Sequence, residues 1–370
     1  MNPVPFFDLS RQHAAMGKCL TEPVATLLAS GSCVLGPVVE SLEEDIAVRC
    51  GARWGIGLSS GTDSLLATLA ALGIGLGDEV VTTPFSFVAT AQAVARTGAR
   101  PVFADIDDAT MDMDPRAAEA ACGPRTKAIL PVHLFGLVAE MDVFEEIARS
   151  RELALVEDAA QAFAASRLGR MAGSWGTAGC HSFYPTKVLG AGGDAGAVTT
   201  SDPDLAERVS RLRAHGEAPD GLHREMGGNF RMDAVQAAIL AAKLPLLEGF
   251  LSARRGHATA YLEALAGTDS VLPSEDPHGR RVWSQFCIRH PRRDDLRAHL
   301  SSRGIGTGVY YRLPLHLEPC FSHLGDRVGD FPNAERAARE ILALPIFPEL
   351  RTDERDRVIE AVLEFEGGAT

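Results

Sequence analysis

Lysine is scarce in this sequence, which narrows the search for reactive amines. Of the 36 basic residues only four are lysines, namely Lys18, Lys127, Lys187 and Lys243. Lys187 follows a predicted strand over residues 179–184 and precedes a glycine-rich loop over 190–196. An amine at the end of a buried strand can lose its proton by desolvation and attack a carbonyl carbon to form an imine. The other reading is a solvated surface lysine, but the remaining three lysines stand in predicted helices or before a strand and are weaker candidates.

An acidic residue follows a second predicted strand. Asp158 comes directly after the predicted strand over residues 153–157. A buried carboxylate is costly unless it meets a cation or strong donors, and a protonated pyridine nitrogen is one such partner. Asp158 could instead cap the following helix.

An anion site is indicated after the first predicted strand. Residues 59–64 read Ser-Ser-Gly-Thr-Asp-Ser and open a helix. The free backbone N–H groups and positive dipole end of such a helix favour phosphate. An ordinary helix cap by Ser60 or Thr62 is the alternative.

Taken together, the three signals are more specific than each alone. A phosphate cradle, an acid that pairs with a ring nitrogen, and a Schiff-base lysine are the parts that hold pyridoxal 5′-phosphate. Phe87, just after the second strand, could stack on the flat ring or pack in the core.

These residues must be positioned by a sheet. From about residue 54 to 200, short β-rich runs alternate with helical patterns, which predicts an α/β fold with a mostly parallel, seven-stranded sheet. The expected strands are 54–59, 79–83, 101–106, 128–133, 153–157, 179–184 and 196–200. Ligands of such sheets bind at the carboxyl ends of the strands, where the candidate residues stand.

The 370-residue chain is long enough for two domains. An apolar helix from Asp233 to about Leu251 contains Pro245, which should kink or break it. We expect a large cofactor-binding domain over residues 1–245, with the N-terminal segment, and a smaller α+β domain over 246–370.

Composition excludes several classes of protein. Hydrophobic residues make up 46% and charged residues 23%, as in folded globular domains. The net charge of −13 argues against nucleic acid as a partner. The chain has no basic leader and no apolar run of about 18 residues, so we expect a cytoplasmic protein without a membrane span. Seven scattered cysteines without a Cys-x-x-Cys pair favour reduced thiols over disulfides, and no metal site is predicted.

At these residues the sequence resembles the DegT/StrS family of sugar aminotransferases, a branch of the fold-type I pyridoxal phosphate enzymes. The resemblance covers almost the whole chain. The matching segments include 61–65, 77–81, 132–136, 157–161, 182–187 and 228–233.

The resemblance implies a role for each matching residue. Lys187 would form the Schiff base and move the proton, Asp158 would pair with the ring nitrogen, and Gln161 would lie near the ring hydroxyl. Phe87 would stack on the ring. Gly61, Thr62 and Ser182 would hold the phosphate, and Asp63 is a further expected cofactor-binding residue. Asn229 would reach the phosphate in the neighbouring subunit, so the resemblance implies a homodimer with shared active sites.

The family resemblance also implies substrates. Its members usually move an amino group from glutamate to a ketone of a nucleotide-linked sugar, here expected at the 3-keto or 4-keto position. Residues matching the sugar-nucleotide contacts are Arg231, Tyr310, Tyr311 and His316. Two alternatives remain open: an aminotransferase acting on a ketocyclitol, and a non-catalytic regulatory protein with the same fold. A nicotinamide enzyme is disfavoured, because the glycine loop lacks the Gly-x-Gly-x-x-Gly spacing after a first strand.

Overall fold

A seven-stranded sheet forms the centre of the protein in a computed structural model, which describes residues 2–367. Its strand order is β1-β9-β8-β5-β4-β2-β3. Strand β9 is antiparallel to both neighbours, and the remaining pairs are parallel. The strands are β1 (Trp54–Leu58), β2 (Glu79–Thr82), β3 (Arg100–Phe103), β4 (Thr126–Leu130), β5 (Ala154–Asp158), β8 (Ala178–Ser182) and β9 (Gly196–Thr200). The predicted fold class and sheet are therefore confirmed.

Alternating apolar side chains allow helices to cover both faces of the sheet. Val81 and Ile129 point into one hydrophobic cluster, whereas their neighbours Val80 and Leu130 point into another. This period of two is what a strand buried on both faces requires. The first cluster lies under α3 (Pro37–Cys50), α6 (Pro115–Ala121) and α7 (Met141–Ser150). The second lies under α4 (Gly61–Ala71), α5 (Ala89–Arg96) and α8 (Pro203–Leu212).

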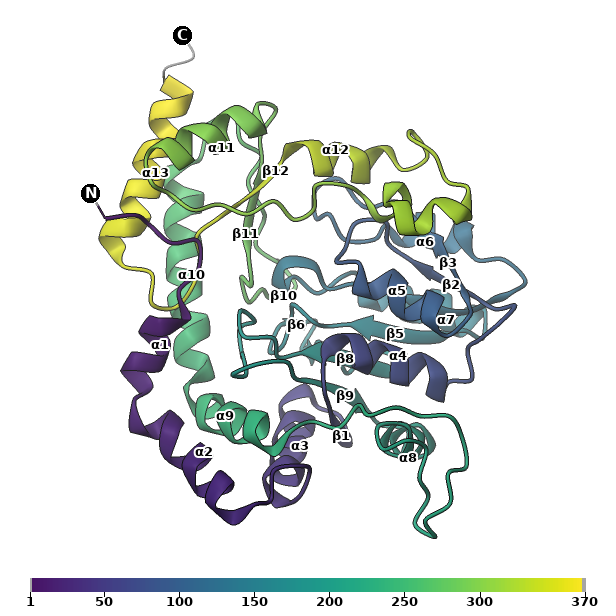
Figure 1. Ribbon diagram of the computed structural model, residues 1–370. Helices are drawn as coiled ribbons and strands as arrows, with labels where there is room; N and C mark the ends of the chain where they lie inside the picture. The colour runs from purple at the N-terminus through teal and green to yellow at the C-terminus, as the bar shows by residue number, and fades with distance from the viewer. Residues whose placement is uncertain (1, 368–370) are drawn as a thin grey trace.

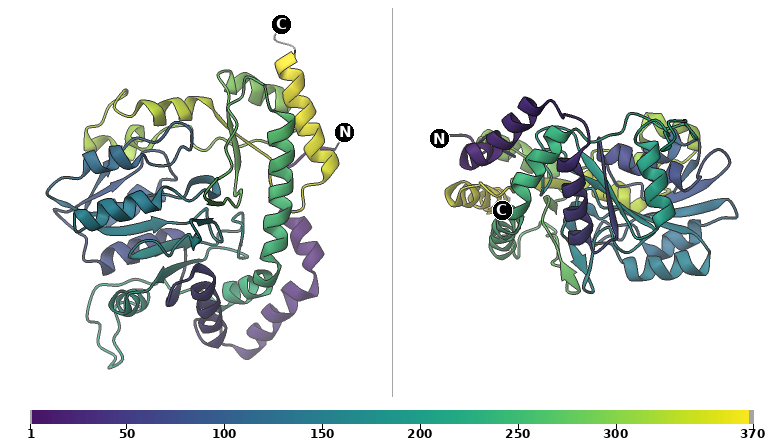
Figure 2. Two further views of the ribbon diagram at one scale, coloured as in Figure 1. Left: turned by 180° about the vertical axis from the view of Figure 1, so that it is seen from behind. Right: turned by 90° about the horizontal axis from the view of Figure 1, so that it is seen from below.

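A long helical segment links the sheet to the C-terminal part of the chain. Helix α9 (Ala234–Lys243) ends in the 3-10 turn η2 (Leu244–Leu246), and α10 (Leu247–Ala264) follows. The break falls at Pro245, as predicted. Figures 1 and 2 show α10 as a long rod beside the sheet layer, with α1 (Leu9–Met16) and α13 (Thr352–Gly367) on its far side.

The C-terminal part is built on a two-stranded antiparallel sheet of β11 (Phe286–Arg289) and β12 (Ile341–Leu344). Two helices pack against this sheet, α11 (Arg293–Ser302) and α12 (Pro332–Glu340). The N-terminal segment contacts this part, because Val4 forms a β-bridge with Ile305 and Arg11 pairs with Glu354 at 2.6 Å. The predicted large domain includes this segment, and the boundary at residue 245 stays a prediction.

The smaller elements complete the description. A three-stranded sheet consists of β10 (Gly279–Arg280), β6 (Ser166–Arg167) and β7 (Arg170–Met171). The remaining elements are α2 (Lys18–Ser30), η1 (Leu134–Gly136), η3 (Leu315–Leu317) and η4 (Pro319–Leu324). All seven cysteines are free.

One helical run passes a length and hydropathy test for a membrane span. It covers Ala234–Ala264, and 44% of its most apolar window is buried inside the protein. The run contains the buried cations Lys243 and Arg254, and Leu240 and Leu251 on it belong to the main hydrophobic cluster. A core helix of a globular protein has the same properties, so the run is weak evidence for a membrane span.

Candidate active site

A cavity of about 470 Å³ lies at the carboxyl ends of the central strands. Its volume falls within the range typical of small-molecule sites. The predicted residues that line it are Gly61, Thr62, Phe87, Asp158, Gln161, Ser182, Lys187, Tyr310 and Tyr311. The structure thus brings together, from five separate stretches of chain, most of the residues singled out in the sequence.

Lys187 stands in the loop between β8 and β9, where its backbone N–H donates to the carbonyl of Tyr184 at 2.8 Å. Burial lowers the pKa of the Lys187 ammonium to about 8, and the charge of Asp158 opposes that shift. Within residues 2–367, no hydrogen bond or ion pair of its Nζ is found. The amine is therefore unpaired and partly deprotonated near neutral pH, as a nucleophile requires.

Asp158 ends β5, and its carboxylate is almost fully buried. The hydroxyl of Thr90 donates to Oδ2 at 2.7 Å, and the N–H of Ala160 donates to Oδ1 at 3.2 Å. Burial raises the pKa of Asp158, while the Thr90 hydrogen bond, the Ala160 N–H and Lys187 lower it. The carboxylate faces the cavity with capacity for a further donor, as a protonated ring nitrogen would provide.

Gln161 is fixed by two hydrogen bonds. Its Oε1 accepts from the N–H of Phe135 at 2.8 Å, and its Nε2 donates to the hydroxyl of Tyr311 at 3.2 Å. Burial raises the pKa of Tyr311, so this phenol stays protonated and can itself donate into the cavity.

Helix α4 begins at the cavity wall. Ser60 is its N-cap and accepts from the N–H of Asp63 at 3.1 Å, so the capping alternative for Ser60 is confirmed. The N–H groups of Gly61 and Thr62 belong to the first turn, which has no intrahelical acceptors. A Cβ on Gly61 would lie 2.6 Å from that of Ser182, so the close approach of these two segments requires glycine. The helix end therefore fits a phosphate as well as an ordinary cap.

Asp63 does not line the cavity. Its Oδ2 accepts from the hydroxyls of Ser59, at 2.7 Å, and Ser60, at 3.0 Å. The predicted contact of Asp63 with a cofactor stays a prediction, and the geometry indicates that it acts through Ser60.

Phe87 lies at the mouth of the cavity with 57% of its surface exposed, so the alternative of core packing is wrong. Its ring centroid is 6.5 Å from that of Tyr311. An exposed aromatic face beside a cavity can stack on a flat ligand.

Besides Asp63, three further predicted residues lie outside this cavity. Asn229 is exposed and forms a β-bridge with Ala214, and Arg231 forms one with Leu58. His316 is buried, with its Nε2 3.3 Å from Glu335 Oε1 and its ring against Phe331. Their predicted contacts with cofactor or substrate are not made in the cavity of their own chain and remain predictions.

Sequence reasoning missed several residues of the site. Thr90 is buried in α5, and only its contact with Asp158, which is 68 positions away, reveals its role. Gln285 comes from the C-terminal part, where no motif marks it. Tyr184 lies in the motif around Lys187 and could have been found there.

Glu157 lies behind the site, adjacent to Asp158 but pointing away from the cavity. Its buried carboxylate accepts from the N–H groups of Gly173, Trp175 and Gly176 at 2.7 to 2.9 Å and pairs with His133 at 2.9 Å. These hydrogen bonds fix the end of β5 and hence the position of Asp158.

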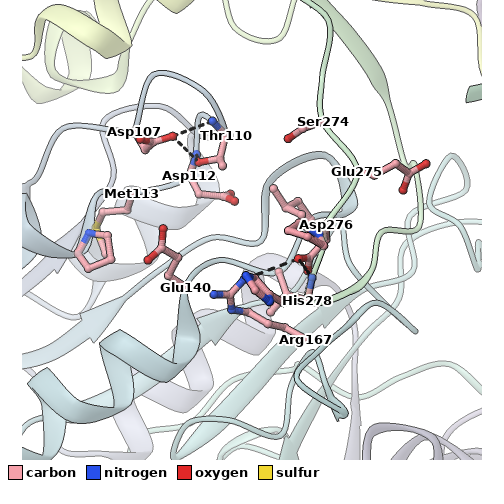
Figure 3. A pocket seen from close by; sticks show the side chains of 14 residues that line it. Asp107, Thr110, Asp112, Met113, Glu140, Arg167, Ser274, Glu275, Asp276 and His278 are labelled. Carbon is pink, nitrogen blue, oxygen red and sulfur yellow. Dashed lines mark hydrogen bonds and ion pairs between the residues drawn. The ribbon is translucent and has the colours of Figure 1, made fainter. Parts of the chain in front are cut away.

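A second cavity of about 290 Å³ lies between the loops after β3 and β4 and residues 274–278 (Figure 3). Acidic side chains dominate it, with Arg167 paired to Asp276 at 3.7 Å. It contains no lysine, so it cannot support imine chemistry.

Comparison with known proteins agrees with this geometry. The sequence model of the DegT/DnrJ/EryC1/StrS aminotransferase family matches residues 15–363. A "pleiotropic regulatory protein" of Geobacillus stearothermophilus is 45% identical, and the match covers 98% of each chain. A dTDP-3-amino-3,4,6-trideoxy-alpha-D-glucose transaminase of Streptomyces venezuelae is 41% identical, covering 98% of this chain and 96% of the relative.

A solved structure shows the same fold. The crystal structure of S. venezuelae DesV in complex with a ketimine intermediate superposes with a TM-score of 0.97 at 41% identity, covering 99% of each chain.

Fold and site together define a pyridoxal phosphate-dependent aminotransferase. The chain belongs to the DegT/DnrJ/EryC1/StrS aminotransferase family, whose relatives include aminotransferases of nucleotide sugars. It is a sugar aminotransferase.

Proposed function

We propose that this enzyme transfers an amino group from glutamate to the 3-ketone of a nucleotide-linked sugar. The observation that carries the chemistry is the unpaired amine of Lys187, with a pKa of about 8, in one cavity with the carboxylate of Asp158. The sequence left the 3-keto and 4-keto positions open. The transaminase of S. venezuelae named above makes a 3-amino sugar, which favours position 3.

The residues of this chain divide the work among themselves. Pyridoxal phosphate, when bound, supplies a carbonyl carbon that accepts the amino group and a ring that withdraws electrons. We propose that Lys187 Nζ would bind this carbon covalently. Once released, the same amine would carry a proton between the cofactor and the substrate carbon. Asp158 keeps a proton on the ring nitrogen, and Gln161 with Tyr311 orients the ring hydroxyl. The first turn of α4, with Ser182, holds the phosphate.

We further propose that the enzyme is a homodimer whose sites are shared. Asn229 and Arg231 end an exposed loop between α8 and α9 and do not reach the cavity of their own chain. The exposed apolar side chains Leu222 and Met226 lie on the same loop, with 56% and 95% of their surfaces accessible. Large exposed apolar side chains are typical of a protein interface. Contact of this loop with a second subunit would bring Asn229 to the partner's phosphate site.

A regulatory role is the second candidate, because the relative with 45% identity is named a regulatory protein. Lys187, Asp158 and Gln161 all line one cavity, which supports turnover. A ketocyclitol as acceptor is a third candidate. We also propose that the enzyme acts in the cytoplasm, because nucleotide-linked sugars are substrates there.

The test is a set of assays with one enzyme preparation. Purified protein with pyridoxal phosphate and glutamate is given a 3-keto nucleotide sugar, a 4-keto nucleotide sugar or a ketocyclitol, and 2-oxoglutarate is measured. The proposal predicts that the 3-keto sugar gives the highest rate. A higher rate with either other acceptor would overturn the substrate assignment, and no 2-oxoglutarate with any acceptor would favour the regulatory role.

A further inference from the structure

A second lysine, Lys243, is completely buried beneath the loop that carries Lys187. It ends α9, and its side chain has no exposed surface. Its Nζ donates to the carbonyl of Gly190 at 2.8 Å. Burial lowers the pKa of Lys243 to about 8, and the charge of Glu349 opposes that shift. Burying an ammonium group costs free energy. Because this one hydrogen-bonds to the loop that carries Lys187, we expect it to do more than fill space in the core.

The backbone of Gly190 is closely linked to that of Lys187. Gly190 follows three residues later, and a Cβ at this position would lie 2.3 Å from the carbonyl oxygen of Pro185. The N–H of Ala191 donates to the carbonyl of Phe183 at 2.8 Å, which closes the loop around Lys187. A displacement of Gly190 therefore moves the short backbone segment from which the Lys187 side chain projects.

Gln236 holds the same loop two turns earlier on α9. Its Oε1 accepts from the N–H of Gly192 at 2.9 Å. Residues seven positions apart lie on one face of a helix. Gln236 and Lys243 therefore both hydrogen-bond to the loop from the same face of α9. Helix α9 is itself anchored in the main hydrophobic cluster through Ala237 and Leu240.

We propose that Lys243 and Gln236 are positioning residues. They hold the 187–193 loop so that the Lys187 amine points at the carbonyl carbon of pyridoxal phosphate. The proposal deepens the aminotransferase assignment, because it concerns the positioning of Lys187. It does not depend on which sugar or amino donor is used.

The test compares Lys243→Met, Gln236→Leu and a matched control, Leu240→Ala. Leu240 is fully buried on the same helix and makes neither of the two hydrogen bonds to the loop, so its truncation destabilises the core and leaves both hydrogen-bonding side chains in place. For each variant, the thermal midpoint, the dissociation constant of pyridoxal phosphate and the rate at which apoprotein captures it are measured by visible absorbance. None of these readouts requires a sugar substrate.

We expect Lys243→Met to weaken pyridoxal phosphate binding at least tenfold and to slow its capture, with Gln236→Leu showing a smaller change in the same direction. Leu240→Ala should lower the thermal midpoint and leave both cofactor readouts within twofold of the parent. If Lys243→Met changes cofactor binding no more than Leu240→Ala does, Lys243 is purely structural and the proposal is wrong.

If Lys243→Met does not fold, the Gln236→Leu variant tests the proposal independently. Gln236 is half-buried, so its replacement by leucine is compatible with folding. Unchanged cofactor capture in Gln236→Leu would then overturn the proposal, and slowed capture would support it.

Discussion

The hydroxyl of Thr90 donates a 2.7 Å hydrogen bond to Oδ2 of Asp158, and Thr90 Oγ1 also lies 2.9 Å from the hydroxyl of Ser86. All three side chains are buried. Because Thr90 helps to keep the carboxylate ionised, the charge that faces the ring nitrogen depends on a residue of a different element, α5.

Replacing Thr90 by valine should impair catalysis, because its hydroxyl donates to the carboxylate of Asp158. The variant keeps the shape and leaves a buried carboxylate oxygen without its donor, which costs about 1–3 kcal/mol. We expect an approximately tenfold loss of kcat and weaker cofactor binding, measured by steady-state kinetics and absorbance titration. Thr90→Ser keeps the hydroxyl and should restore both, whereas equal defects in the two variants would show that packing, not the hydrogen bond, matters.

Asp158→Asn tests the carboxylate directly. The amide is nearly isosteric but neutral, so it cannot stabilise a protonated ring nitrogen. Removing a group that stabilises developing charge typically costs about 10²–10³ in kcat. We expect a loss of this size, measured under saturating pyridoxal phosphate so that weaker binding does not contribute. Kinetics close to those of the parent enzyme would contradict the role of Asp158.

Cofactor capture by the apoprotein should depend on pH through Lys187. Below pH 8 its amine is mostly protonated and not nucleophilic, and above pH 8 it is mostly free, because burial lowers its pKa from 10.5 to about 8. The capture rate should therefore rise with pH and level off above about pH 8. In Asp158→Asn the midpoint should move to lower pH, since Asp158 raises this pKa. A rate that keeps rising to pH 10 would be inconsistent with a desolvated Lys187.

Shared sites can be tested with mixed dimers. Asn229→Ala should weaken pyridoxal phosphate binding about tenfold or more, because a hydrogen bond to a charged group contributes about 1.5–3 kcal/mol. In a heterodimer of one Lys187→Ala chain and one Asn229→Ala chain, sharing predicts one site with both native residues. Cofactor titration should then find one site of parental affinity per heterodimer. If Asn229 acts within its own chain, no such site exists.

The sequence predicted the strands and the residues that directly follow them, because both are set by local pattern. Strand β4 ends at Leu130, earlier than expected, since Pro131 has no N–H to continue the ladder and Val132 forms only an isolated bridge with Asp158. Strand β12 was missed because its four apolar residues follow α12 without a turn signal.

Tertiary contacts account for the parts of the site that were not predicted. Helix α5 packs on β2 and β3, and the hydrogen bond from Thr90 in its first turn to Asp158 at the end of β5 spans the sheet edge, which nothing near Thr90 in the sequence indicates. His316 lies in η3, and the residues that contact its ring are Glu335 of α12 and the preceding Phe331. Local spacing cannot reveal such partners.

The most direct test is the covalent bond at Lys187. Holoenzyme is reduced with borohydride, digested and mapped by mass spectrometry, with Lys187→Ala and the exposed Lys18→Ala as controls. We predict a stable pyridoxyl adduct on Lys187 in the parent and in Lys18→Ala, and none in Lys187→Ala, which should also lack turnover. An adduct on another lysine, or none in the parent enzyme, would contradict the assignment of Lys187.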